Sequence, residues 1–439
     1  MSLSTATGCR DASDHGAMRG TRGVPFWLLV AGVMAWCYFA QPLDLFYTLG
    51  PDPSVDSHIR AIREGNLARQ VSLLLMGIWA AVWIAVHRSM LHLDGRLAAF
   101  ALLFLFIVAA SIGWADDPLL SAKRAAALLA FAVCCVAIAQ HVGLDHVASL
   151  AFWGSALAVG VSCGAELALG TFAPLDPAYR FAGIMHANLQ GVYCACLTLA
   201  GFSLARRERQ HAMAYAFGAG IGFAFLLLTK SRDSLVSVLV SLTFYLAVTS
   251  ARARYWLLIA STAGAIAAVP LLFADRGTAA PLWELLRLGR QEDVSTIMTL
   301  SGRTELWQGL LYYVYEQPLL GFGYGGFWTP QRLTALTQRA GWVFGSAHSQ
   351  YFEIVLSVGV LGLAVYCGTG LTALWRLVTG YRRSRADCYA FGAALIVLVA
   401  VDMLANSVPL EPSLPIVLCV TIVAGLAVVN GLKGTAGRH

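Results

Sequence analysis

The stretch Leu97-Ala-Ala-Phe-Ala-Leu-Leu-Phe-Leu-Phe-Ile-Val-Ala-Ala-Ser-Ile-Gly113 carries no charged side chain and decides the fold of this chain. A helix needs about 20 mainly apolar residues to cross the hydrocarbon core of a bilayer. Comparable apolar blocks recur along the sequence. They cover residues 24–40, 71–86, 97–113, 125–140, 147–169, 188–204, 212–229, 235–250, 256–273, 350–375, 390–404 and 414–429. The pattern predicts an all-α polytopic membrane protein with about twelve transmembrane helices.

The composition agrees with this prediction. Hydrophobic residues make up 58% of the chain and charged residues 12%, whereas soluble domains carry about 25% charged residues. The formal net charge is +6, and the arginines gather near the ends of alternate apolar blocks. Because basic loops stay on the inner side of a membrane, we interpret the positive charge as an orientation signal and expect no nucleic-acid partner.

The charge pattern also predicts how the chain is divided across the membrane. With a cytoplasmic N-terminus, the arginine-rich loops fall inside and most loop aspartates outside, so both termini are expected to be cytoplasmic. The expected segments are a disordered cytoplasmic N-terminus (1–23), transmembrane helices 1–9 (24–273), a large outer loop (274–349), transmembrane helices 10–12 (350–432) and a cytoplasmic tail (433–439).

The large outer loop has helix signals of its own. Thr329-Pro330 predicts a helix start, because proline is favoured at the first helical position. Ser301 is a candidate N-cap for an earlier amphipathic helix. The face of that helix is expected to carry Arg303, Leu306, Trp307, Leu310, Leu311 and Val314. We expect the loop to form short helices that lie over the outer membrane face.

Histidine is the natural general base near neutral pH. The predicted topology leaves His58, His186 and His348 on the outer side. His348 lies where the large loop meets the next span, which is the level at which a lipid-linked substrate presents its headgroup. We take His348 as the candidate catalytic residue; the alternative is an interfacial histidine that only caps a helix.

Three arginines on the same side are candidate phosphate ligands. Arg232 lies in a short outer turn, Arg303 begins the predicted loop helix, and Arg180 precedes another span. A guanidinium can grip two phosphate oxygens at once and keeps its charge at any accessible pH. The alternative for Arg232 and Lys230 is that they anchor helix ends at the membrane surface, and we favour it for Lys230 only.

Acidic residues within the apolar blocks fall toward the outer ends of the spans. Glu166, Glu353 and Asp402 either line the same cavity or orient His348, and both interpretations stay open. Asp116-Asp117 resembles an acidic metal-binding pair, but Asp117-Pro118 is also typical of a helix start. We expect the structural role there and predict no metal site.

Several motifs occur in an order that resembles the O-antigen ligase/polymerase superfamily. In the outer loop they are Ser301-Gly-Arg-Thr-Glu-Leu-Trp307, Pro318-Leu-Leu-Gly-Phe-Gly-Tyr-Gly-Gly-Phe-Trp328 and Ala347-His-Ser-Gln-Tyr351. Earlier motifs are Trp114-Ala-Asp-Asp-Pro118, Arg180-Phe-Ala-Gly-Ile-Met-His-Ala-Asn188 and Thr229-Lys-Ser-Arg232. The resemblance covers most of the chain from the third span onward. Two small departures are Ser349, where many members have Asn, and Ala115, where many have Ser.

The resemblance implies a glycosyltransferase with a GT-C-like fold in the bacterial inner membrane, which makes the outer loop periplasmic. It implies a glycan donor on undecaprenyl diphosphate, no metal or other cofactor, and a single displacement with inversion at the anomeric carbon. Arg232 and Arg303, with Arg180, would bind the diphosphate, and His348 would deprotonate the acceptor hydroxyl. Tyr324 and Trp328 are candidate sugar contacts, with loop packing as the alternative.

The acceptor distinguishes members of this superfamily. A polymerase extends another lipid-linked repeat unit of an exopolysaccharide or O-antigen, whereas an O-antigen ligase transfers the chain to lipid A core. The loop motifs look closest to exopolysaccharide polymerases, so we expect a polymerase and keep the ligase as the alternative. A transporter or flippase of lipid-linked glycans is the alternative from another class. It predicts ionisable residues along a path through the membrane, whereas here they cluster on the outer side.

Overall fold

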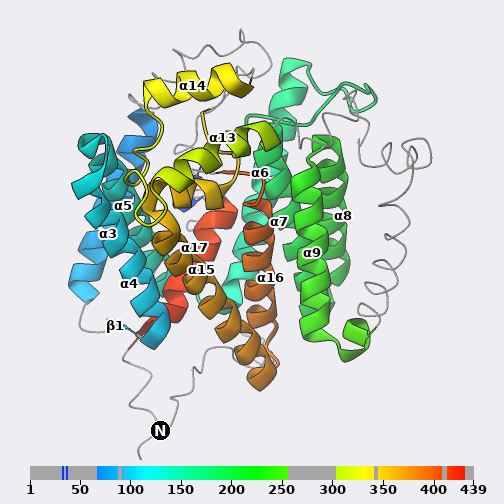
Figure 1. Cartoon of the computed structure of the whole chain (residues 1–439). Helices are drawn as coiled ribbons and strands as arrows, with labels where there is room; N and C mark the ends of the chain where they lie inside the picture. The colour runs from blue at the N-terminus through cyan, green and yellow to red at the C-terminus, as the bar shows by residue number, and fades with distance from the viewer. Residues whose placement is uncertain are drawn as a thin grey trace, which may run out of the picture.

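The computed structural model describes residues 32–33, 36–37, 67–87, 91–93, 95–255, 303–340, 345–407 and 413–430, and most of these residues are helical. The bundle consists of α3 (Leu67–His87), α4 (Gly95–Ala110), α5 (Pro118–His141), α6 (Val147–Leu169), α7 (Ala187–Arg207), α8 (Ala212–Thr229), α9 (Arg232–Thr249), α15 (Gln350–Ser384), α16 (Asp387–Asp402) and α17 (Leu414–Ala427). Two further helices, α13 (Arg303–Glu316) and α14 (Pro330–Ala340), cover one end of it (Figure 1).

Short elements complete the described part. The 3-10 helices are η2 (Ser111–Trp114), η3 (Leu144–His146) and η4 (Arg209–His211). An antiparallel pair of three-residue strands, β1 (Leu91–Leu93) and β2 (Val428–Asn430), lies at the end of the bundle opposite to α14 (Figure 1). The sequence did not predict this pair.

The helices have the length and composition of membrane spans. Seven of the described helical segments are long and apolar enough to cross a membrane, and α3 and α17 contain shorter apolar stretches. This agrees with a polytopic membrane protein. The predicted span 256–273, most of 24–40, and the residues His58 and Ser301 lie outside the described residues.

Helix α7 occupies the centre of the bundle. Within its apolar window 83% of the residues are buried, and it packs against α6, α8, α9, α16 and α17. Its N-terminus is therefore enclosed by other helices, whereas α8 faces outward along most of its length. The central position of α7 brings the residues around its first turn into the interior of one bundle end.

Several arginines lie at the end of the bundle that is away from α13 and α14. Arg252, Arg254, Arg382 and Arg383 follow or end α9 and α15, whose C-terminal ends lie opposite to α13 and α14 (Figure 1). The predicted inner-side arginines and the predicted outer loop are thus at opposite ends of the molecule. This separation is the arrangement that the charge pattern predicts.

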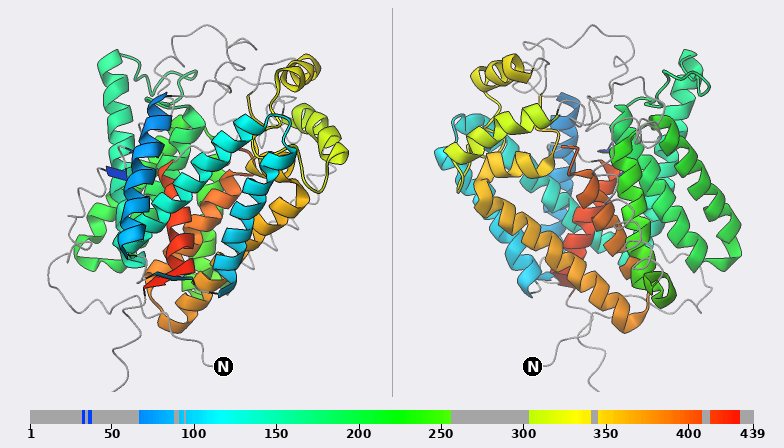
Figure 2. Two further views of the ribbon diagram at one scale, coloured as in Figure 1. Left: turned by 90° about the vertical axis from the view of Figure 1, so that its left-hand side faces the viewer. Right: turned by 45° about the vertical axis from the view of Figure 1, so that its right-hand side comes forward.

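Helix α15 differs from the predicted span 350–375. It continues to Ser384 and is broken at Val358 (φ −133°, ψ 15°) and Gly359 (φ 69°, ψ −175°), and the bend is visible in Figure 2. The preceding turn satisfies backbone groups around the break: the Phe322 amide donates to Leu356 O (2.8 Å) and the Val360 amide donates to Pro318 O (2.8 Å). The break therefore docks the loop onto the bundle.

The helix starts predicted from proline are confirmed. Helix α5 begins at Pro118, earlier than the predicted 125, and the Asp117 side chain accepts a hydrogen bond from the Leu120 amide. Helix α14 begins at Pro330 after Thr329. In α13 the predicted face is partly wrong, because Leu306 and Leu310 are buried while Leu311 is exposed.

Candidate active site

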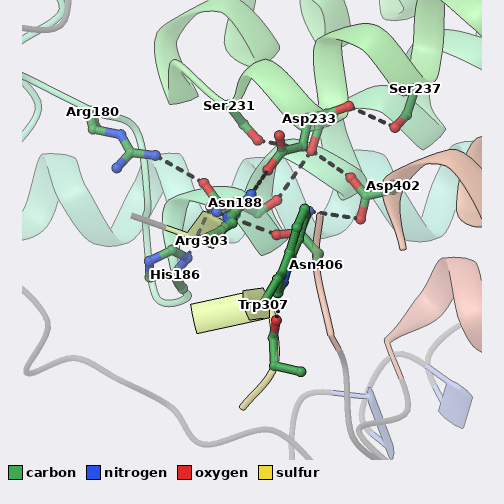
Figure 3. A network of polar contacts seen from close by, with 12 residues as sticks. Arg180, His186, Asn188, Ser231, Asp233, Ser237, Arg303, Trp307, Asp402 and Asn406 are labelled. Carbon is green, nitrogen blue, oxygen red and sulfur yellow. Dashed lines mark hydrogen bonds and ion pairs between the residues drawn. The ribbon is translucent and has the colours of Figure 1, made fainter. Parts of the chain in front are cut away.

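Several helix termini come together at the end of the bundle that α13 covers. Residues of the N-termini of α7, α9 and α13 and of the C-terminal end of α16 meet there (Figure 3). The start of α15 joins them, because the Gln350 backbone amide donates to Met403 O and Asn406 O. Helix N-termini carry partial positive charge, so this grouping favours a bound anion. The residues whose side chains link these termini are called the polar network here: Arg180, His186, Asn188, Asp233, Ser234, Arg303, Asp402 and Asn406.

Arg303 is placed in this network by its position at the first residue of α13. Its NH1 forms an ion pair with Asp233 Oδ2 at 3.1 Å, and 13% of its side chain is exposed. Asp233 itself lies in the first turn of α9, where a negative charge is favourable. The ion pair therefore fixes the start of the loop helix α13 to the start of a bundle helix.

Arg232 is the neighbour of Asp233 and opens α9, after Ser231 at the N-cap. Its side chain is half-buried. Lys230 has a left-handed backbone (φ 51°) and its ammonium group donates to the Pro177 carbonyl. Lys230 thus ties the turn to the neighbouring loop, in agreement with the anchoring role that the sequence favours for it.

Arg180 is held by its loop. Its Nε donates to Thr229 O and its NH2 to Asn188 Oδ1, both at 3.1 Å. The loop is ordered by Glu166, whose carboxylate accepts hydrogen bonds from the amides of Ala182 (3.0 Å) and Gly183 (2.6 Å) and from the Tyr179 hydroxyl. Glu166 therefore shapes the loop that carries Arg180.

His348 lies directly before α15, and Ser349 occupies the N-cap. The Ser349 side chain makes no capping hydrogen bond, so the helix-capping alternative for His348 stays open. Burial, the Arg303 guanidinium and His186 lower the pKa of His348 to about 4. Its imidazole is consequently neutral at physiological pH and can accept a proton. The backbone amide of Gln350, two residues after His348, donates to Met403 O and Asn406 O, so His348 lies at the same bundle end as the polar network.

His186 and Asn188 are site residues that the sequence analysis did not assign. His186 is the N-cap of α7, and its Nδ1 accepts the Asn188 amide at 3.2 Å. The Asn188 side chain receives the Arg180 bond and donates to Asn406 Oδ1 at 3.5 Å. The motif that contains both residues was recognised, but their roles depend on partners far away in the sequence.

Asp402 closes the network from α16. Only 4% of this residue is exposed, and its carboxylate accepts hydrogen bonds from Ser234 Oγ and Asn406 Nδ2, both at 3.1 Å. The Gln350 amide donates to the Met403 and Asn406 carbonyls (3.0 and 3.2 Å), which joins the start of α15 to the same place. Asp402 thus belongs to the cluster and supports its framework.

The aromatic candidates Tyr324 and Trp328 are placed in packed surroundings. Trp328 is 5% exposed and its indole donates to Glu353 Oε2 at 2.9 Å. Tyr324 packs against an apolar cluster that contains Val358, and its amide donates to Ser111 Oγ at 2.9 Å. The geometry favours loop packing, the alternative considered for these two residues, over direct sugar contact.

The acidic pair Asp116-Asp117 is structural. Asp117 caps α5, and Asp116 Oδ2 forms an ion pair with Arg332 NH1 at 2.6 Å. The Arg332 guanidinium also lies 4.1 Å from the centre of the Phe322 ring, so the pair ties α14 to the bundle. Among the residues that the structure describes, no group of three or more His, Cys, Asp or Glu could hold a metal ion.

Comparisons with known proteins agree with the motifs. Residues 217–367 match the family model described as O-antigen ligase, a range that includes Arg232, Arg303 and His348. The chain is also similar to the exopolysaccharide production protein ExoQ of Rhizobium meliloti (strain 1021), with 27% identity over 329 residues that cover 70% of this chain and 71% of that protein.

Proposed function

We propose that this chain, as a member of the O-antigen ligase/polymerase superfamily, is a glycosyltransferase with a GT-C-like fold. It is metal-independent and inverts the configuration at the anomeric carbon. It takes a glycan from undecaprenyl diphosphate at the periplasmic face of the bacterial inner membrane. The observation that carries this proposal is the position of His348 directly before α15, at the bundle end where Arg303 pairs with Asp233 and the N-termini of α7, α9 and α13 meet. A base and an anion-binding surface thereby share one end of the bundle.

The arginines are the groups that bind the donor diphosphate in this proposal. Arg303, Arg232 and Arg180 open or precede helices at this bundle end, and their charges add to the helix dipoles. Charge develops on the diphosphate as it leaves the sugar, and preorganised cations stabilise it most in a water-poor site. The arginines fill the role that a divalent cation has in other diphosphate-dependent enzymes.

The acceptor is activated by His348. Its imidazole removes the proton of the acceptor hydroxyl while that oxygen attacks the anomeric carbon. The new C–O bond forms as the bond between the anomeric carbon and the diphosphate oxygen breaks. Undecaprenyl diphosphate leaves with the electron pair, and the configuration at the anomeric carbon inverts.

The membrane delivers the donor to this site. The network lies at the bundle end opposite to the arginine-rich ends of α9 and α15, and the positive-inside rule supports a periplasmic position for it. Both termini are then cytoplasmic. A polyprenyl chain stays in the bilayer while its diphosphate reaches the network from the outer leaflet.

We assign the acceptor as another lipid-linked repeat unit, so that the product is a polymer. The similarity to an exopolysaccharide production protein supports this choice. The alternatives remain an O-antigen ligase that uses lipid A core and a transporter of lipid-linked glycans. The ionisable network at one bundle end favours transfer chemistry over a transport path.

An assay with purified protein and labelled undecaprenyl-diphosphate repeat units separates these functions. Ladders formed without lipid A core support the polymerase. One shift that requires lipid A core indicates the ligase. Movement of the label across proteoliposomes without a new glycosidic bond indicates a transporter and contradicts the proposal.

A further inference from the structure

Ala347, the residue before His348, is held through both of its backbone polar groups. The Ala347 amide donates to Glu353 Oε1 at 2.6 Å, and the Ala347 carbonyl accepts from Trp307 Nε1 at 2.9 Å. Ala347 is fully buried and Glu353 is 8% exposed. Two side chains from different helices, α13 and α15, therefore fix the position of Ala347, which directly precedes His348.

The conformation of His348 makes such support necessary. Its φ is 48°, a region that residues other than glycine adopt rarely because it is strained for them. A strained residue persists where the surrounding structure over-determines it. The contacts on both sides of Ala347 provide that constraint within one residue of the strained position.

The chemistry of Glu353 suits the role. Its second oxygen, Oε2, accepts from Trp328 Nε1 at 2.9 Å, so the two carboxylate oxygens face two N–H donors. A carboxylate is acceptor-only, whereas a glutamine side chain offers one acceptor and one donor. A glutamine here would place N–H against N–H, either at Trp328 or at Ala347.

We propose that Glu353, together with Trp307, is a positioning residue that holds the His348 imidazole in the geometry for proton transfer. The inference rests on the proposed glycosyltransferase function. Glu353 acts through the Ala347 peptide, so its loss lowers the rate of the chemical step and leaves donor binding by the arginines largely intact. From the sequence alone, this acid could equally line the cavity or orient the histidine.

The kinetic test first replaces the Glu353 carboxylate by an amide, which leaves one N–H donor without an acceptor, and then removes that donor. Glu353→Gln is expected to lower kcat about 10- to 100-fold, with KM within about twofold, because one buried donor loses its acceptor. Adding Trp328→Phe removes the opposing donor and should bring kcat back close to that of Trp328→Phe alone. Trp307→Phe should lower kcat about tenfold, since it keeps the ring stacked on Phe352 but loses the bond to Ala347 O.

Trp375→Phe, an exposed tryptophan on the same α15, is the matched control and should leave kcat unchanged. Thermal unfolding of each variant in detergent shows whether it is folded. Restoration by Trp328→Phe would not occur if Glu353 only stabilised the fold through its charge. A Glu353→Gln variant with wild-type kcat, or an unaltered Trp307→Phe, overturns the proposal.

A second readout does not need activity. Diethyl pyrocarbonate acylates neutral imidazole, so its pH-dependent reaction with the His348 peptide, read by mass spectrometry, reports the pKa of His348. In the wild type this pKa lies below the usual value because of burial, Arg303 and His186. Glu353→Gln should move it upward as the ring leaves this environment; an unchanged pKa contradicts the inference. If the wild type transfers no glycan, the proposed function fails while this experiment still decides the positioning role.

Discussion

In the proposed mechanism, the basicity of His348 would depend on whether the donor is bound. In the free protein Arg303 and His186 add to the effect of burial and lower its pKa to about 4, which makes the imidazole neutral but weakly basic. A donor diphosphate would bring negative charge next to Arg303 and offset its effect on His348. The proposed base would therefore gain strength when the donor is in place.

The pH dependence of the reaction should show this change. The acid limb of kcat/KM reports the free enzyme and that of kcat the enzyme–substrate complex. A lowered pKa means that activity is lost as the pH drops through that pKa. The midpoint of the acid limb of kcat/KM should therefore lie well below pH 6.5, and the midpoint of the acid limb of kcat should lie at a higher pH. Steady-state rates across the pH range check this, and coincident limbs would contradict the role of the diphosphate.

Substitution by lysine tests the arginines, because it keeps the positive charge but removes the planar guanidinium that forms two parallel hydrogen bonds. Arg232→Lys and Arg303→Lys should each lower kcat/KM about 10- to 100-fold, because an ammonium cannot grip a diphosphate with two parallel hydrogen bonds. Arg339→Lys, an exposed arginine on α14, is the matched control. Wild-type kcat/KM in Arg232→Lys would show that Arg232 only anchors its helix.

At the scale of elements, the break in α15 connects the loop to the site. The short segment before Gly359 carries Glu353 and follows His348, and the loop turn at Pro318–Phe322 fills the break. A Cβ on Gly359 would lie 2.0 Å from Leu319 O, and its φ is 69°. Both features require glycine at this position.

Gly359→Ala should therefore destabilise the docking of the loop, lowering the unfolding temperature by several degrees and reducing transfer activity. Gly370→Ala is the matched control, since a Cβ there meets nothing within 4 Å and it lies on the same helix. Thermal unfolding in detergent measures the difference. Equal melting temperatures for the two variants would mean that the break does not hold the loop.

Elements that are specified by neighbouring residues could be predicted from the sequence, whereas features that depend on distant residues could not. Asp117-Pro118 and Thr329-Pro330 specify helix starts through nearby backbone groups, so sequence alone located them. The α15 break was missed because Gly359 sits within an uninterrupted apolar run, and its partner Leu319 comes from the preceding loop. Likewise, the link between Asn188 and Asn406 spans 218 positions, and no periodic pattern connects them.

For the whole molecule, the proposed mechanism needs the polar network to face the periplasm. Leu175, 96% exposed in the loop before α7, lies on the network side, and Gln210 lies in the exposed η4 turn at the other end of α7. In intact spheroplasts a membrane-impermeant maleimide should label Leu175→Cys and spare Gln210→Cys until the membrane is permeabilised. The parent protein gives the background from its native cysteines, and the reverse pattern would contradict the orientation.

The central claim is that His348 performs base-assisted glycan transfer. The most direct measurement is turnover of labelled undecaprenyl-diphosphate repeat units by the purified wild type and by His348→Asn, because asparagine tolerates a positive φ better than most residues. The account predicts polymer and released undecaprenyl diphosphate from the wild type. His348→Asn should unfold at the wild-type temperature but turn over at least about 100-fold more slowly. A folded His348→Asn variant with a rate within about threefold of the wild type would contradict the claim.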